Sequence, residues 1–368
     1  MRIKWVDELK GYLLIIICME HMHINNELVS TGLSISTAYS VSTFFFISGF
    51  LFNDTAVYNA KEYISHKLRS LLLPYFTLSI LFTFLDPRLY DISLLKYDPI
   101  VSLHYFPGIV LSNVFCGTID YFMNAFGWIF LAGRSTPCTM PMWFVLSLFF
   151  ASSIFSWFFL TFNRSKTIIA LSSCIALMGG WLLSIYDVLL VFNLSSVLTA
   201  YFFYSLGFLA KPIVSIIQGI KTINLIVCLF VLSLLYLIGI NINGAVNLIS
   251  NSLGPDFGGY LMSTGSGIAL LICAFVLFSR IKFKLFGGIL RNIARNGIIV
   301  LAVHYWLLRI CFEFIDRDYI VGGVHYISFY SIGFVVMGTI LTIPIFRNKL
   351  YWLIGTRKVS VKESLSVM

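Results

Sequence analysis

Two ionisable side chains on one predicted helix are candidates for chemistry in a membrane, one near the start of an apolar run and one deep within it. Residues 7–25 form a predicted helix on which Lys10 and His21 are eleven residues apart. At about 100° per residue, both side chains share one face roughly 16 Å apart along the axis, near the stripe of Asp7. A neutral imidazole can remove a proton from a hydroxyl or accept an acyl group. Lys10 alone is better explained as an anchor reaching the membrane surface, whereas His21, with Glu20 beside it, favours a functional role.

A second group lies in the apolar run 297–314. His304 is about eight residues into this run, near mid-depth. Two interpretations stay open, a contact with substrate and a hydrogen bond to a neighbouring helix. Arg309 and Glu313 are four residues apart, so they are expected to pair on one helix face, an arrangement that is more often structural than chemical.

A third group, Lys67 and Arg69, precedes a predicted helix that Pro74 bends. The two cations are either ordinary positive residues at the inner membrane face or a cradle for a phosphate-bearing donor. Ser48 and Gly49 interrupt the apolar stretch "FFFISGFLFND". They are either small residues at a helix contact or a passage for an acyl chain near the donor cations.

Composition indicates the elements that must position these residues. The 368-residue chain is 59% hydrophobic and 11% charged, with a mean hydropathy of +0.91, and apolar runs recur along its length. We therefore expect an all-α, polytopic bundle of membrane helices. The net charge of +9 does not indicate nucleic acid, because the basic residues are scattered in short loops. The seven cysteines form no CxxC pair and none is paired with histidine, so no metal site is predicted.

About ten spans are expected, the first of them not cleaved as a signal peptide. Their limits are 7–25, 37–53, 70–86, 142–162, 166–185, 189–210, 222–240, 259–279, 297–314 and 325–346. With a cytoplasmic N-terminus, 20 of the 25 basic residues lie in inside segments, 4 lie outside, and Arg309 lies within a span. This asymmetry predicts that both termini are cytoplasmic. We expect a membrane domain at 1–348 and a basic tail at 349–368.

The outer segment from Asp86 to Pro141 is long and rich in aromatic residues. We expect re-entrant or interfacial helices that cover an outer cavity, with an extra pair of spans as the alternative. It holds Cys116 and Cys138. An oxidising compartment outside the membrane permits a disulfide between them, and two free thiols are an equally good expectation.

Five stretches in this order resemble the signatures of the acyltransferase-3 membrane proteins. They are "WVDELKGYLLIIICMEH", "FFFISGFLF", "KLRSLLLPYF", "MWFVLSLFF" and "IARNGIIVLAVHYWL". The most specific match is a basic residue, ten residues and then a histidine, which Lys10 and His21 meet. The chain departs from relatives at Glu20, where many have glycine, and at Tyr39-Ser40-Val41-Ser42, where relatives often have Phe-His-Met-Pro.

The resemblance implies a ten-helix enzyme of the bacterial inner membrane. Such proteins transfer an acyl group, usually acetyl from acetyl-CoA, to a hydroxyl of an envelope glycan such as O-antigen or a lipid-linked sugar. It also implies a catalytic His21 and an essential Lys10, while Lys67, Arg69, Ser48 and Gly49 are donor-binding candidates. The remaining candidates, for substrate contact or support, are Asp7, Glu20, Trp143, His304 and Arg309. Acetyl-CoA would be a substrate rather than a bound cofactor.

Several alternatives remain at this level. His21 would act either as a general base or as the nucleophile that carries the acetyl group. A glycan polymerase or handler of lipid-linked glycans would share the many spans and the large outer loop, but would not need a histidine on the first helix. A secondary transporter would use buried ionisable residues as a relay, yet the chain lacks the paired, related halves typical of that class.

The basic-residue count generates a test of topology. Reporter fusions after Phe162, Lys211 and Arg347 should report a cytoplasmic position, and a fusion near Asp98 should report an outside position. The physical reason is that loops rich in Lys and Arg stay on the cytoplasmic side. A cytoplasmic signal at Asp98 would overturn the topology and put the expected donor and acceptor on the wrong faces.

Overall fold

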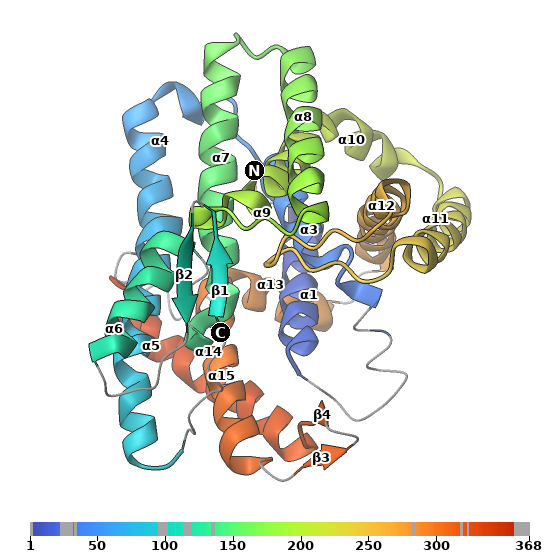
Figure 1. Cartoon of the computed structure of the whole chain (residues 1–368). Coiled ribbons are helices and arrows are strands. Elements are labelled where there is room, and N and C mark those ends of the chain that lie inside the picture. Colours follow the sequence, from blue (N-terminus) through green and yellow to red (C-terminus); the bar gives the residue numbers. More distant parts are fainter. Residues whose placement is uncertain are drawn as a thin grey trace. The chain divides into compact units, whose positions relative to one another are not determined.

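The fold is almost entirely helical (Figure 1). The computed structural model describes residues 3–22, 32, 35–94, 102–106, 108–112, 119–133, 137–281, 284–316, 319–321 and 324–356. Within these ranges, 8 helices are long and apolar enough to cross a membrane. They lie at Lys61–Asp91, Thr139–Thr161, Lys166–Ile185, Val191–Leu209, Thr222–Asn243, Phe257–Ile281, Gly297–Ile315 and Phe329–Asn348. The expected polytopic helical membrane fold is confirmed, and these helices match the third to the tenth expected spans.

The first two expected spans are helices too, but they are shorter than expected. α1 (Lys4–Glu20) has 17 residues and α3 (Ser40–Phe50) has 11. At 1.5 Å per residue α3 is only about 17 Å long, less than the ~30 Å of a bilayer core. α1 ends at Glu20, just before His21, and histidine is a weaker helix former than the leucines earlier in the helix.

The chain divides into two compact units that interleave in sequence. The first comprises Met1–Glu20, Asn26–Tyr58 and Phe150–Arg295. Besides α1 and α3, it contains most of α7 (Trp143–Thr161), and then α8 (Lys166–Ile185), α9 (Leu194–Leu209), α10 (Lys211–Gly219), α11 (Thr222–Asn243), α12 (Phe257–Ile281) and α13 (Lys284–Arg295). In this unit α11 packs on α12, α9 packs on both α3 and α8, and α1 packs on α13.

Two glycines let α3 and α9 approach each other closely. A Cβ added at Gly49 would lie 1.7 Å from the carbonyl oxygen of Tyr204, and one added at Gly207 would lie 1.9 Å from that of Phe46. The backbones are therefore in direct contact at both positions, and only glycine fits there. The Ser48 hydroxyl donates to the Phe44 carbonyl of its own helix at 2.8 Å. Both members of the Ser48-Gly49 pair thus have a packing role.

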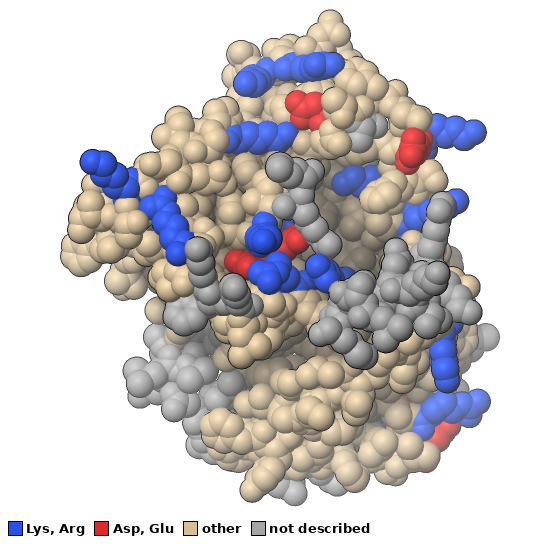
Figure 2. All heavy atoms as spheres, turned by 180° about the vertical axis from the view of Figure 1, so that it is seen from behind, with Lys and Arg blue, Asp and Glu red and all other residues tan. Residues whose placement is uncertain are grey.

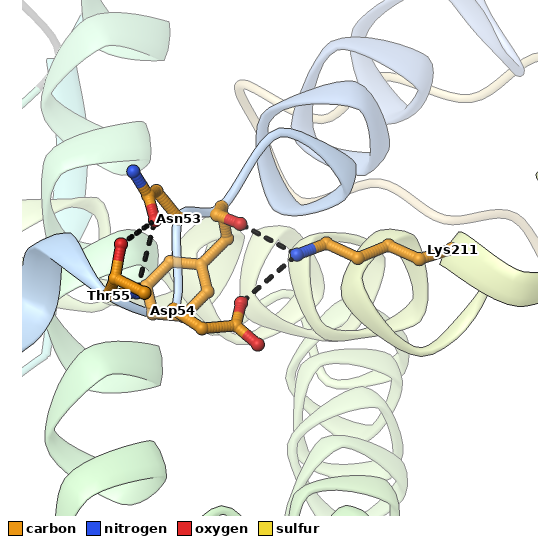
Figure 3. A network of polar contacts seen from close by, with 5 residues as sticks. Asn53, Asp54, Thr55 and Lys211 are labelled. Atoms are coloured by element: carbon orange, nitrogen blue, oxygen red, sulfur yellow. Dashed lines mark hydrogen bonds and ion pairs between the residues drawn. The ribbon is translucent and has the colours of Figure 1, made fainter. Parts of the chain in front are cut away.

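A lysine closes the turn that follows α3 (Figure 3). Lys211 Nζ donates to the Phe52 carbonyl at 2.6 Å and to Asp54 Oδ1 at 3.2 Å. Its ammonium also lies over the Phe208 ring, 4.8 Å from the centroid. Asn53 Oδ1 accepts from the backbone N–H and the hydroxyl of Thr55, at 3.0 and 2.8 Å. The polar end of "FFFISGFLFND" is therefore a compact, hydrogen-bonded turn.

The second unit comprises His21–Asn25, Asn59–Phe149 and Asn296–Met368. Its helices are α4 (Ala60–Lys67), α5 (Leu73–Asp91), α6 (Ile119–Phe126), α14 (Gly297–Ile310) and α15 (Phe329–Asn348), and its two hairpins pair β1 (Ser102–Tyr105) with β2 (Ile109–Ser112) and β3 (Ile320–Val321) with β4 (Val324–His325). α14 packs on α15. Ser165 and Ser328 cap the starts of α8 and α15 with their hydroxyls.

The long outer segment differs in part from the expected re-entrant or interfacial helices. It contains the antiparallel hairpin β1–β2 before α6, and α6 continues into a π-helical turn at Gly127–Ala132. Gly108 has a φ of +97°, a conformation that glycine adopts freely, and its N–H donates to Tyr105 O at 2.7 Å. The Pro107-Gly108 pair between apolar, partly β-branched residues is a turn signal, which explains the hairpin. Cys116 lies outside the described residues, so its pairing with Cys138 stays a prediction.

α4 and α5 form one continuous helix with a π-helical turn at Leu68–Leu72. Pro74 follows this turn and has no N–H to donate, so the wider turn accommodates it. A Cβ added at Gly355 would lie 1.7 Å from the Arg69 carbonyl oxygen, and Thr77 donates to the Leu353 carbonyl at 2.5 Å. The first part of the expected tail therefore packs on this helix, and residues 357–368 lie outside the described ranges.

Figure 2 shows basic side chains scattered over the face in view, with fewer acidic side chains, most of which lie next to basic ones. This distribution agrees with the net charge of +9. Which face of the membrane these side chains occupy stays a prediction that the fusion experiment tests.

The α3–α9 contact predicts the effect of one added methyl group. Gly49→Ala should lower the free energy of unfolding by about 1–3 kcal/mol, because its Cβ meets backbone that cannot rotate away. Gly265→Ala on α12 is the matched control, since nothing lies within 4 Å of its Cβ and alanine favours a helix by about 0.8–1.0 kcal/mol. Thermal unfolding in detergent would compare the two variants, and equal midpoints would contradict the proposed contact.

Candidate functional site

The two membrane histidines singled out from the sequence lie side by side in the second unit. The ring centroids of His21 and His304 are 5.7 Å apart, with the rings tilted by 32°. Tyr305 meets His21 edge-on, with the centroids 5.1 Å apart. Sequence reasoning chose both histidines separately and did not predict that they would meet, because the two positions are 283 residues apart.

His304 presents a free lone pair to this site. It is 1% exposed, and its Nδ1 lies 2.7 Å from the Val300 carbonyl oxygen one turn earlier in α14. A carbonyl only accepts, so Nδ1 carries the proton and Nε2 carries the lone pair. Nε2 is buried and has no hydrogen-bond partner among the described residues. Two interpretations were open for His304, a contact with substrate and a hydrogen bond to a neighbouring helix. Nδ1 bonds within α14 instead, which leaves Nε2 available as an acceptor.

His21 lies one residue beyond the end of α1, in a turn, rather than within the helix as expected. Lys10 is half-buried on α1, and Asp7 lies one turn before it. The neighbouring motif residues pack α1 on α13. A Cβ added at Gly11 would lie 2.0 Å from the Leu290 carbonyl oxygen. The Gly of the lead-in motif is therefore explained by close backbone packing, while the role of Lys10 stays a prediction.

Lys67 and Arg69 lie on either side of the point where α4 becomes the π-helical turn. Arg69 is exposed, and Lys67 Nζ lies over the Tyr63 ring, 5.5 Å from its centroid. Gly355 fixes the backbone of Arg69 from the other side. The two cations are thus held on an ordered element, an arrangement suited to a phosphate-bearing ligand. Ser48 and Gly49 have packing roles, so the structure adds no support for donor binding by these two residues.

Arg309 has a partner that the sequence spacing did not suggest. Its Nη1 donates to Asp86 Oδ2 at 2.7 Å, and its Nη2 donates to the Tyr90 hydroxyl at 3.3 Å. Trp306 Nε1 donates to the other carboxylate oxygen of Asp86 at 3.0 Å. Asp86 was missed because it was placed at the outer end of a span, whereas α5 continues to Asp91 and Asp86 is 1% exposed. The sequence nevertheless contained a signal for Asp86, because this residue is a carboxylate at the end of an apolar run.

The remaining two candidates have simple surroundings. Trp143 is buried at the start of α7, with its ring centroid 6.4 Å from that of Phe144. Glu20 ends α1 and accepts a hydrogen bond from the Ser36 hydroxyl at 2.7 Å. Trp143 therefore acts as a packing residue in the described contacts, whereas Glu20 is a polar residue held by a hydroxyl.

The Asp86–Arg309 ion pair should be worth far more than an exposed pair on the same helix. Asp86→Ala should lower the free energy of unfolding by about 3–5 kcal/mol, because it leaves a buried guanidinium without its carboxylate. Asp91→Ala is the control. It breaks the Arg88–Asp91 pair, whose side chains are 82% and 64% exposed, and should cost about 0–1 kcal/mol. Thermal unfolding in detergent measures both, and similar losses would show that the buried pair does not stabilise α14.

The described geometry thus joins two imidazoles in an apolar, helical protein, and comparison with known proteins indicates the chemistry. The profile of a family described as an acyltransferase domain matches residues 3–346, which is nearly the whole chain. No curated protein and no solved structure matches the chain. A match of this length favours a membrane acyltransferase over a glycan polymerase or a transporter. The chain belongs to the acyltransferase-3 family.

Proposed function

We propose that the chain is an O-acetyltransferase of the bacterial inner membrane. It would move acetyl from cytoplasmic acetyl-CoA to a hydroxyl of a cell-envelope glycan, such as O-antigen, or of a lipid-linked sugar. The observation that carries the proposal is the juxtaposition of His21 and His304, with centroids 5.7 Å apart, in a chain of an acyltransferase family. Acyl transfer to a hydroxyl requires a group that takes its proton, and an imidazole is the side chain that most often does so.

The reaction forms an ester C–O bond and breaks the thioester C–S bond of the donor. As general base, His21 takes the hydroxyl proton while the oxygen attacks the thioester, and then gives that proton to the leaving thiolate of CoA. As nucleophile, His21 first accepts the acetyl group and passes it to the hydroxyl in a second step. Both routes need a neutral imidazole. General-base assistance contributes about 10²–10⁴-fold in rate.

His304 has a distinct role in this proposal. Its Nδ1–H is engaged with Val300, so its Nε2 can only accept a hydrogen bond. We assign Nε2 to the acceptor hydroxyl, which it would hold beside the imidazole of His21. A group held in this way loses little freedom when the reaction begins, which is the benefit of positioning in catalysis.

The donor would be recognised by its phosphates. Lys67 and Arg69 are the residues that we assign to them, because both cations sit on an ordered turn and both residue types bind phosphate well. Lys10 is assigned to donor handling on the strength of its spacing from His21 alone. Acetyl-CoA would be consumed as a substrate, and the lipid bilayer would surround the helices.

The roles of the two histidines predict different losses. His21→Ala should lower ester-linked acetate on the surface glycan by 10² or more, the scale of a lost general base (~10²–10⁴). His304→Asn should lower it about tenfold, since asparagine can still donate to Val300 but lacks an acceptor at the Nε2 position. Each variant would be expressed in a strain that lacks the gene, and base-released acetate would be measured by mass spectrometry.

His104→Ala is the matched control, because His104 is exposed on β1 and should leave acetylation unchanged. Protein levels in the membrane must be matched by immunoblot. Substantial acetylation by His21→Ala at a matched level would contradict the proposed role of His21. A glycan without ester-linked acetate even in the wild-type strain would contradict the proposed reaction itself.

A further inference from the structure

Helix α1, in the first unit, carries three carboxylates, Asp7, Glu8 and Glu20, and the last two have different partners. Glu8 is 7% exposed and forms an ion pair with Arg291 of α13. Glu20, at the other end of the same helix, accepts from the Ser36 hydroxyl at 2.7 Å and has no ion pair within the described part of the chain. A carboxylate at membrane depth without a cation is costly, and such residues face functional sites as a rule.

Hydroxyl groups surround the Glu20 carboxylate. The Ser40 hydroxyl is 0% exposed and lies within hydrogen-bonding reach of it. Tyr39 and Tyr236 also lie close to Glu20. The two tyrosine rings meet edge to face, with centroids 5.4 Å apart. Glu20 therefore sits among aromatic rings and hydroxyls, and it can accept further hydrogen bonds beside those from the two serines, since a carboxylate offers about four acceptor sites.

We propose that Glu20, Ser36, Ser40, Tyr39 and Tyr236 form the binding site for a sugar ring of the acceptor. This inference rests on the proposed function and names the residues that would select its acceptor. Glu20 directly precedes His21 in the sequence.

The chemistry of the site distinguishes a sugar from other ligands. The Glu20 carboxylate only accepts hydrogen bonds, whereas the buried Ser40 hydroxyl both donates and accepts. A sugar hydroxyl is both donor and acceptor, so it can donate to the carboxylate and accept from a neighbouring group. The flanking tyrosine rings supply the apolar wall that is typical of small-molecule sites, and the Tyr236 hydroxyl, which donates to the Ile35 carbonyl, can still accept.

The test separates acceptor binding from chemistry. Purified full-length protein would be given labelled acetyl-CoA and, as acceptor, glycan extracted from a strain that lacks the gene. Glu20→Gln should raise the KM for glycan by about 10- to 100-fold, the effect of losing hydrogen bonds to a charged group. The KM for acetyl-CoA should stay unchanged. Glu20→Asp, which keeps the charge, should recover part of the lost affinity, whereas a merely structural carboxylate would change both KM values or neither.

Two further measurements keep the outcomes distinct. Ser40→Ala, a smaller change that serves if Glu20→Gln fails to fold, should also raise only the KM for glycan. Unfolding temperature with and without glycan reports binding independently of transfer, and glycan should stabilise the wild type but not Glu20→Gln. An active wild type whose KM for glycan is unchanged in Glu20→Gln and Ser40→Ala overturns the inference and leaves the proposed function standing. Stabilisation by glycan without any acetyl transfer supports the site and overturns the proposed function.

Discussion

The buried carboxylate of Asp86 fixes the helix that carries His304. One of its oxygens accepts from Arg309 and the other accepts from Trp306, and both donors lie on α14. An unpaired charge in an apolar interior is costly, so α14 cannot slide or rotate on α5 without losing both bonds. His304 is two residues before Trp306 in the same helix. The buried ion pair between Asp86 on α5 and Arg309 on α14 therefore holds the imidazole of His304 in place for its contact with His21.

The candidate sites of the two units differ in how their polar groups are paired. In the second unit, a charge pair provides rigidity, and the imidazole of His304 keeps Nε2 unbonded. In the first unit, Glu8 is paired with Arg291 and supports packing, while Glu20 is surrounded by hydroxyls. In both places the structural charges have charged partners, whereas, among the described residues, Glu20 forms no ion pair and His304 Nε2 has no hydrogen-bond partner. This difference is the physical basis on which the proposed roles of His304 and Glu20 depend.

The helical membrane fold was predictable because long apolar runs have few alternatives in a bilayer. The limits of the later spans agree with the helices to within a few residues. Hydropathy did not predict the lengths of α1 and α3. It indicates apolar runs, but it does not show at which residue a helix ends or where glycine permits close packing. The hairpin β1–β2 was missed for a similar reason, because its short apolar strands resemble pieces of helix and only the Pro107-Gly108 turn signal in the sequence marks them.

At the candidate site, the position of His21 and His304 within apolar runs singled out both residues, but their contact joins residues far apart in the chain. Asp86 was overlooked because its partner, Arg309, lies on a distant helix and a pair with Glu313 was the nearer choice.

Reconstitution into lipid vesicles would examine the proposed transfer without the rest of the cell. The purified chain would be supplied with labelled acetyl-CoA and with glycan from a strain that lacks the gene, and base-labile label on the glycan would be counted over time. The proposed role of the imidazole pair predicts steady labelling by the wild type, a loss of about 10²-fold or more for His21→Ala, and unchanged labelling for His104→Ala. Equal labelling by the wild type and His21→Ala would contradict it.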